Sequence, residues 1–170
     1  MALPFASLGI GLFPALALVI LVAVGLPALF AAFVALALSA IVTGAMSEDA
    51  IADAADGLFG GTTPARRLEI LKDSRHGTYG VLAIVLVTGL KAAALASMAA
   101  DGPITAALAW LAAGIIARSG ALYLPLALKP AKQDGAAAAA AGTLTRNAFV
   151  VGGVFALLLG MILAAPFVGL

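Results

Sequence analysis

The sequence predicts an all-α, polytopic membrane protein, a bundle of about five transmembrane helices with an acidic and basic cytoplasmic loop. The first observation is composition, since 64% of the 170 residues are hydrophobic and only 10% are charged. A soluble domain carries about a quarter charged residues, so this chain must have lipid as its solvent. The second observation is that its apolar residues fall into runs of the ~20 residues that a helix needs to cross a bilayer.

Five such runs are separated by turns or polar segments, and each is expected to form one span. The runs are approximately 8–25, 27–46, 78–99, 104–128 and 148–168. Short "GLP" and "DGP" sequences join the first to the second and the third to the fourth, as is typical of tight turns. No cleavable signal peptide is expected, because no basic region precedes the long first run.

Basic residues concentrate in the two long polar connections, 47–77 and 129–147. The positive-inside tendency places both connections and the N-terminus in the cytoplasm, and the C-terminus outside. The low-complexity segment "DGAAAAAAG" (134–142) is expected to be a helix extension or a loop. The absence of cysteine excludes disulfides and thiolate metal sites. A net charge of +1 gives no indication of nucleic-acid binding.

Four of the eight acidic residues fall within nine positions after the second run: Glu48, Asp49, Asp53 and Asp56. If 47–57 is helical and continues the span, the three aspartates are spaced i, i+4, i+7 and share a face. Carboxylates ~6 Å apart repel by roughly 3 kcal/mol per pair, and no Lys or Arg lies nearby in the sequence to offset this. All four are therefore candidate ligands of Mg²⁺, which typically also binds substrate phosphates. The alternative is a solvated acidic face at the membrane edge.

The next segment, "PARRLEILKDSRHGTYG" (64–80), is expected to start as an amphipathic helix and brings cations close to these carboxylates. Phosphoryl transfer needs metal-holding carboxylates together with cations that stabilise charge. The candidate catalytic residues here are Lys72, Asp73 and Arg75. Arg66 and Arg67 are equally well explained as membrane anchors, and His76 is expected to be a structural donor rather than a base.

Two charges lie inside predicted spans, Lys91 in the third and Arg118 in the fourth. Such a residue costs about 2.5–3.5 kcal/mol when it faces lipid, so it usually faces the bundle interior and is functional. We expect both to line a polar cavity that opens toward the acidic cluster, and we count both as candidate catalytic residues.

The motifs at these positions resemble the cobalamin synthase family, the adenosylcobinamide-GDP ribazoletransferases. "EDAIADAADGLFGG" is similar to the family's D-x3-D-x2-D-G element, and "RRLEILKDSRHGTYG" to a second element at nearly the same distance. The first element is matched by Glu48, Asp49, Asp53, Asp56 and Gly57. The second is matched by Glu69, Lys72, Asp73, Ser74, Arg75, Gly77, Thr78 and Gly80. Lys91, and Arg118 within "ARSGALYL", also fall where the family has charged residues in its helices.

The resemblance implies an inner-membrane, Mg²⁺-dependent enzyme of late vitamin B12 synthesis. It would join adenosylcobinamide-GDP to α-ribazole, or to its 5′-phosphate, and release GMP. The resemblance covers roughly 8–165, with departures: Ala50 replaces a usual Gly, Met46 and Ser47 replace a His-containing lead-in, and family chains are longer at both ends. A homo-oligomer is left open.

Two other functions remain as alternatives. A CDP-alcohol phosphotransferase would need an Ala-Arg pair and a second acidic pair after Asp53, Asp56 and Gly57, and neither is present. A divalent-cation carrier or channel would need acidic or carbonyl ligands across the bilayer, whereas the charges inside the predicted spans are cations.

Overall fold

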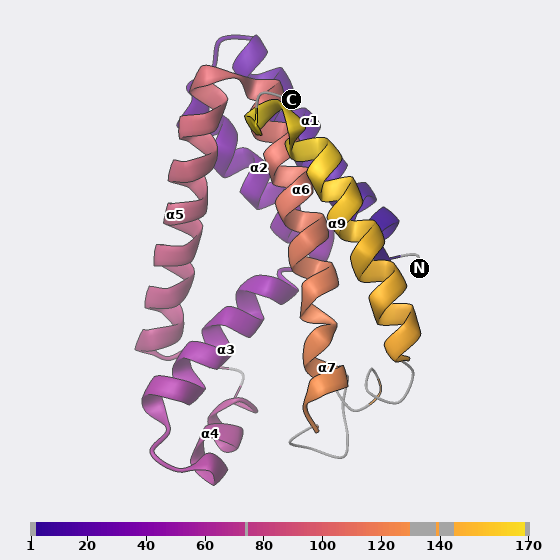
Figure 1. Ribbon diagram of the computed structural model, residues 1–170. Helices are drawn as coiled ribbons and strands as arrows, with labels where there is room; N and C mark the ends of the chain where they lie inside the picture. The colour runs from indigo at the N-terminus through magenta and orange to yellow at the C-terminus, as the bar shows by residue number, and fades with distance from the viewer. Residues whose placement is uncertain (1–2, 74, 130–138, 140–144, 169–170) are drawn as a thin grey trace. The chain divides into compact units, whose positions relative to one another are not determined.

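The computed structural model describes residues 3–73, 75–129, 139 and 145–168, and these contain helices and no strand. Most of the predicted loop 129–147, including most of "DGAAAAAAG", lies outside the described residues, as does Ser74. The helices are α1 (Leu3–Ala23), α2 (Ala28–Thr43), α3 (Met46–Gly60), α4 (Pro64–Ile70), α5 (Thr78–Asp101), α6 (Pro103–Ala121), α7 (Tyr123–Ala127) and α9 (Arg146–Val168) (Figure 1).

Within the described part of the chain, four helical segments are long and apolar enough to cross a membrane. These are Leu3–Ala23, Thr78–Asp101, Pro103–Ala127 and Arg146–Ala165. A fifth span results if α2 and α3 are counted as one broken span or re-entrant pair. The predicted all-α, polytopic membrane fold of about five spans is therefore confirmed.

The described chain divides into two compact units, residues 17–103 and residues 1–16 with 104–170. In the first unit α5 packs against both α2 and α3, and α3 also packs against α4 (Figure 1). Its core is built from small side chains, which let helices approach closely in lipid. The buried small residues include Ala31, Ala32 and Ala35 of α2, Ala52 of α3, and Gly80, Ala92 and Ala99 of α5.

A sharp corner separates α2 from α3. The two helices are bent by 90° across Gly44 and Ala45, which both adopt left-handed angles (φ 63° and 56°). The N–H of Ala45 bonds to the carbonyl of Ala40 (2.7 Å) and that of Gly44 to Ile41 (3.2 Å), the pattern of a Schellman motif. Residues 47–57 are therefore helical, as supposed, but they do not continue the second run as a straight helix, because the chain turns before the helix with the carboxylates begins.

The predicted loop 47–77 contains both α3 and α4. Thr63 caps α4, since its Oγ1 accepts a hydrogen bond from the N–H of Arg66 (3.2 Å), and Pro64 follows at the first helical position. The helix ends by Ile70, so the amphipathic helix expected from Pro64 onward is short. Residues 71–77 then lead to the N-terminus of α5.

The second unit packs the start of α1 against α6 and α9. The indole Nε1–H of Trp110 on α6 donates to the carbonyl of Gly11 on α1 (3.2 Å). A Cβ at Gly11 would lie 2.9 Å from Leu111, and one at Gly160 of α9 would lie 2.8 Å from Ile116 of α6. Glycines at these two positions therefore allow the helices of this unit to approach closely.

Candidate functional site

The carboxylate of Asp56 binds the N-terminus of α5. Its Oδ2 accepts a hydrogen bond from the N–H of Gly77 (2.6 Å), and its Oδ1 accepts one from the N–H of Gly80 (2.8 Å). Gly77 is the N-cap of α5 and Gly80 is its third helical residue. In a capping box these two N–H groups are satisfied by side chains of the same helix. Here one carboxylate from α3 satisfies both, and it is buried, with 7% of Asp56 exposed.

This contact explains why positions 77 and 80 are both glycine. A Cβ at Gly77 would lie 2.5 Å from Oδ1 of Asp56, and a Cβ at Gly80 would overlap the same carboxylate and lie 3.0 Å from the carbonyl of Ala52. Gly77 has extended angles (φ −84°, ψ −179°) that any residue can adopt. The need for glycine is therefore one of space rather than of backbone conformation.

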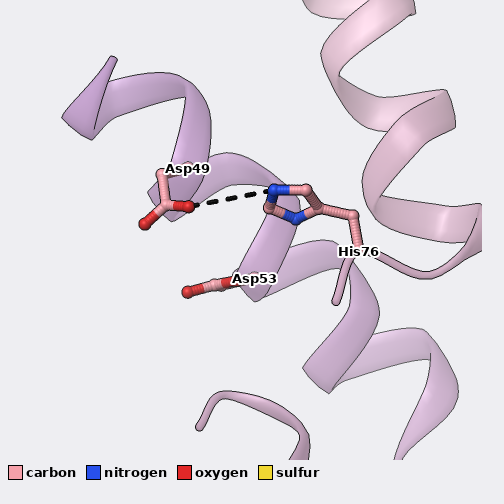
Figure 2. Close-up of side chains that lie close together, drawn as sticks. All are labelled: Asp49, Asp53 and His76. Carbon is pink, nitrogen blue, oxygen red and sulfur yellow. Dashed lines mark ion pairs between the residues drawn. The ribbon is translucent and has the colours of Figure 1, made fainter. Parts of the chain in front are cut away.

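Asp49, Asp53 and His76 converge beside this contact. One ligand atom from each of the three lies within 4.8 Å of the others. Nε2 of His76 is 4.0 Å from Oδ1 of Asp49. Figure 2 shows the two aspartates on successive turns of α3, with the imidazole reaching toward Asp49 from the segment before α5. Two carboxylates and an imidazole are a donor set that fits a divalent cation.

Glu48 and Asp49 occupy the first turn of α3, where no side chain caps the helix. Negative charge there offsets the positive end of the helix dipole. Glu48 is half-buried, and its Oε2 has no hydrogen-bond partner among the described residues. It does not belong to the group of three that converges around His76. The structure thus divides the four predicted metal ligands: Asp49 and Asp53 meet His76, Asp56 caps α5, and Glu48 stands apart.

Asp73 and Arg75 pair with each other. Nη2 of Arg75 lies 2.7 Å from Oδ2 of Asp73, and Nε lies 3.0 Å from Oδ1. The side-chain and backbone hydrogen bonds from Arg75 lower the pKa of Asp73 to about 2, and the same pairing raises the pKa of Arg75. Both side chains are exposed at one edge of the site, so this pair depends on good geometry rather than on burial.

Two open depressions meet at the N-terminal end of α5. One, of about 470 Å³, is lined by several charged and polar residues, including Asp56, Asp73, Arg75 and His76. The other, of about 430 Å³, shares His76 and continues along an apolar strip of α5. The apolar strip consists of Val81, Leu82 and Val85. A ligand at this end of α5 would therefore meet charge at one side and aliphatic side chains at the other.

The remaining predicted catalytic residues lie apart from this convergence or are not placed relative to it. Lys72 is exposed and lies two residues beyond the end of α4. Lys91 is exposed on α5, 13 positions after its start, which corresponds to roughly 20 Å along the axis. It lines neither depression. Arg118 lies on α6 in the other unit, where its Nη1 would be 2.9 Å from a Cβ at Gly114. Their catalytic roles stay predictions.

His76 is the residue that the sequence reasoning undervalued. Its neighbours in sequence gave no reason to place it beside α3, because that proximity depends on how the start of α5 is held. The available indication was Gly77-x-x-Gly80, whose two glycines mark a close approach to another group.

Comparisons with known proteins agree with the motifs. The whole chain, residues 1–170, matches the family model described as cobalamin-5-phosphate synthase. A protein of Rhizobium johnstonii named adenosylcobinamide-GDP ribazoletransferase is 46% identical over 138 residues, which cover 81% of this chain and 53% of that protein. One of the same name from Azorhizobium caulinodans is 42% identical over 168 residues, covering 99% of this chain and 63% of the relative. No solved structure is significantly similar to the chain. The chain thus spans between about half and two thirds of the length of these relatives.

Proposed function

The chain belongs to the cobalamin-5-phosphate synthase family, and we propose on this premise that it is a transferase of late cobalamin synthesis. Its substrates would be adenosylcobinamide-GDP and α-ribazole, or the 5′-phosphate of α-ribazole. Its products would be adenosylcobalamin, or the corresponding 5′-phosphate, and GMP. Support comes from the relatives named adenosylcobinamide-GDP ribazoletransferase and from the convergence of Asp49, Asp53 and His76.

The reaction is a displacement at phosphorus. The 3′-hydroxyl oxygen of α-ribazole forms a bond to the cobinamide-linked phosphorus of the diphosphate. The bond from that phosphorus to the bridging oxygen breaks, GMP leaves with the electron pair, and the hydroxyl proton is released. Such a reaction needs positioning and charge stabilisation more than a covalent nucleophile. Carboxylates and cations at one end of a helix are suited to that demand.

Asp49 and Asp53 would hold Mg²⁺, which is bound in proteins by one or two carboxylates together with substrate phosphates. When bound, the cation would neutralise the diphosphate. His76 lies close enough to Asp49 and Asp53 to act as a further ligand of the cation, or to donate its N–H to a phosphate oxygen of a bound substrate. Arg75, which lines the 470 Å³ depression together with His76, would offset negative charge on the phosphoryl oxygens.

We also propose that this site faces the cytoplasm from the inner membrane. Arg66, Arg67, Lys72 and Arg75 all lie in the connection between α3 and α5, and cytoplasmic segments are enriched in such residues. A nucleotide-activated substrate would then reach the site from the cytoplasm.

The test is GMP release by purified protein given adenosylcobinamide-GDP, α-ribazole and Mg²⁺. Asp53→Asn should abolish release while the protein still inserts into membranes. Asp101→Asn is the matched control, because Asp101 is exposed at the opposite end of α5 and should leave release unchanged. Normal turnover in Asp53→Asn would show that the metal assignment is wrong. Metal-dependent flux across liposomes without GMP release would instead favour a cation carrier.

A further inference from the structure

We propose that Asp56 is a positioning residue rather than a metal ligand: its carboxylate caps α5 and thereby holds His76 beside Asp49 and Asp53. The proposal depends on the proposed function only in assuming that Asp49, Asp53 and His76 bind a metal ion. The cap is a contact within one compact unit and can be tested separately.

The surroundings of the Asp56 carboxylate favour N–H groups over a cation. Each of its oxygens already accepts a short hydrogen bond from a backbone N–H of α5. Those donors form the positive end of the helix dipole, which attracts anions and repels cations. A metal ion bound to this carboxylate would have to lie against that positive end. The three side chains that do converge as possible ligands leave Asp56 out.

The cap also explains why His76 reaches α3. His76 directly precedes Gly77, whose N–H is held by Oδ2 of Asp56. Asp56 lies two turns along the same helix from Asp49 and one turn from Asp53, so fixing Gly77 to Asp56 fixes the next residue over the two aspartates. The ring contact between Phe59 of α3 and Tyr79 of α5, with centroids 5.6 Å apart, supports the same junction.

The N-terminus of α5 can be capped by a side chain of α5 itself instead of by Asp56 of α3, and this substitution provides the experiment. Asp56→Ala removes the carboxylate and leaves the N–H groups of Gly77 and Gly80 without it. Gly77→Ser adds an N-cap hydroxyl at a position that already has extended angles, as N-caps do. With Asp56 present the added Cβ clashes; with Asp56→Ala the clash is gone. The double variant therefore restores a cap without restoring a carboxylate.

We expect Asp56→Ala to raise amide hydrogen exchange at the start of α5 by about ten- to hundredfold and to weaken Mn²⁺ binding, measured by electron paramagnetic resonance. Asp56→Ala with Gly77→Ser should recover exchange at α5 to within about threefold of the original protein, given that a serine N-cap restores most of what an N-cap contributes. Mn²⁺ binding should stay weak in this variant, because the serine caps α5 from within and does not tie residue 77 to α3. Asp53→Ala is the matched control: it should abolish Mn²⁺ binding and leave exchange at α5 unchanged. Asp53→Ala with Gly77→Ser should not recover Mn²⁺ binding.

Two results would overturn the proposal. One is unchanged exchange at α5 in Asp56→Ala, which would show that the carboxylate does not cap the helix. The other is an additive loss of affinity: if Asp56 acts through His76, Asp56→Ala with His76→Ala should bind Mn²⁺ no more weakly than Asp56→Ala alone, and a much lower affinity in this double variant would make Asp56 a ligand. If the original protein neither binds Mn²⁺ nor releases GMP, the proposed function fails, and the exchange measurements still decide whether Asp56 holds α5.

Discussion

Asp56 and Gly80 are 24 residues apart in the chain, yet the N–H of Gly80 donates to Oδ1 of Asp56 across 2.8 Å. This bond joins the helix that carries the carboxylates to α5, the longest helix in the described part of the chain. It leaves no room for a side chain at Gly80. At this point of the interface between α3 and α5, an acidic side chain of one helix therefore lies directly against the backbone of the other.

The first prediction concerns space at that contact. Gly80→Ala should lower the free energy of unfolding by about 1–3 kcal/mol, because the added methyl overlaps Asp56 and crowds the carbonyl of Ala52. Gly89→Ala on the same helix is the control, since a Cβ there meets nothing within 4 Å. It should be neutral or stabilising by up to ~1 kcal/mol. Thermal unfolding in detergent measures both, and equal effects would contradict the close approach.

The second prediction concerns the corner between α2 and α3. Ala45→Gly should stabilise the protein by about 1 kcal/mol, because Ala45 is held at φ 56°, where a Cβ is strained. Ala50→Gly, at an exposed position within α3, should instead destabilise it by roughly 0.5–1 kcal/mol. Unfolding midpoints of the two variants should thus move in opposite directions. A loss of stability in Ala45→Gly would rule out the left-handed conformation.

The third prediction separates His76 from the aspartates by metal preference. Imidazole suits Zn²⁺, whereas carboxylates suit Mg²⁺. His76→Ala should weaken Zn²⁺ binding at least about tenfold, the loss seen when only the partner of a metal ligand is removed, and should weaken the binding of Mg²⁺ or Mn²⁺ less. Asp49→Asn should weaken both. Titration calorimetry distinguishes the two patterns, and an unaltered Zn²⁺ affinity in His76→Ala would exclude the imidazole as a ligand.

The fourth prediction concerns pH and the pair Asp73–Arg75. The pKa of Asp73 lies at about 2 in the folded protein, below the ordinary value of 3.8, so the pair stabilises the ionised carboxylate. Its contribution is present above pH 3.8 and is lost as the pH falls toward 2. Arg75→Gln should return the carboxyl titration toward 3.8, followed by NMR of the Asp73 carboxyl carbon. A titration that Arg75→Gln does not shift would show that the pair is absent in solution.

The fifth prediction concerns the unit that contains α6. Gly11→Ala should be destabilising by about 1–3 kcal/mol, because its Cβ would lie 2.9 Å from Leu111, next to the hydrogen bond from Trp110. Gly9→Ala, two residues earlier on α1, meets nothing within 4 Å and should be tolerated. Tryptophan fluorescence during unfolding reports the contact directly. Equal tolerance of the two substitutions would argue against packing at Gly11.

The all-α membrane fold and the approximate number of spans could be predicted from the sequence, because hydrophobic run length is a direct requirement of the bilayer. The corner could not, because nothing in the type of Ala45 favours a left-handed conformation. The different surroundings of the three aspartates could not be predicted from the sequence either. A spacing of i, i+4, i+7 puts Asp49, Asp53 and Asp56 on one face, and only the position of α5 shows which of them it covers.

The corner at Gly44 and Ala45 has a consequence for mobility. Straightening it would require both residues to change the sign of φ and would break the two hydrogen bonds that end α2. We therefore expect it to act as a rigid elbow rather than as a hinge, so that α3 moves together with α2. If an ion and a phosphate bind as proposed, their entry and exit would be accommodated by rotation of exposed side chains such as Asp49 and His76.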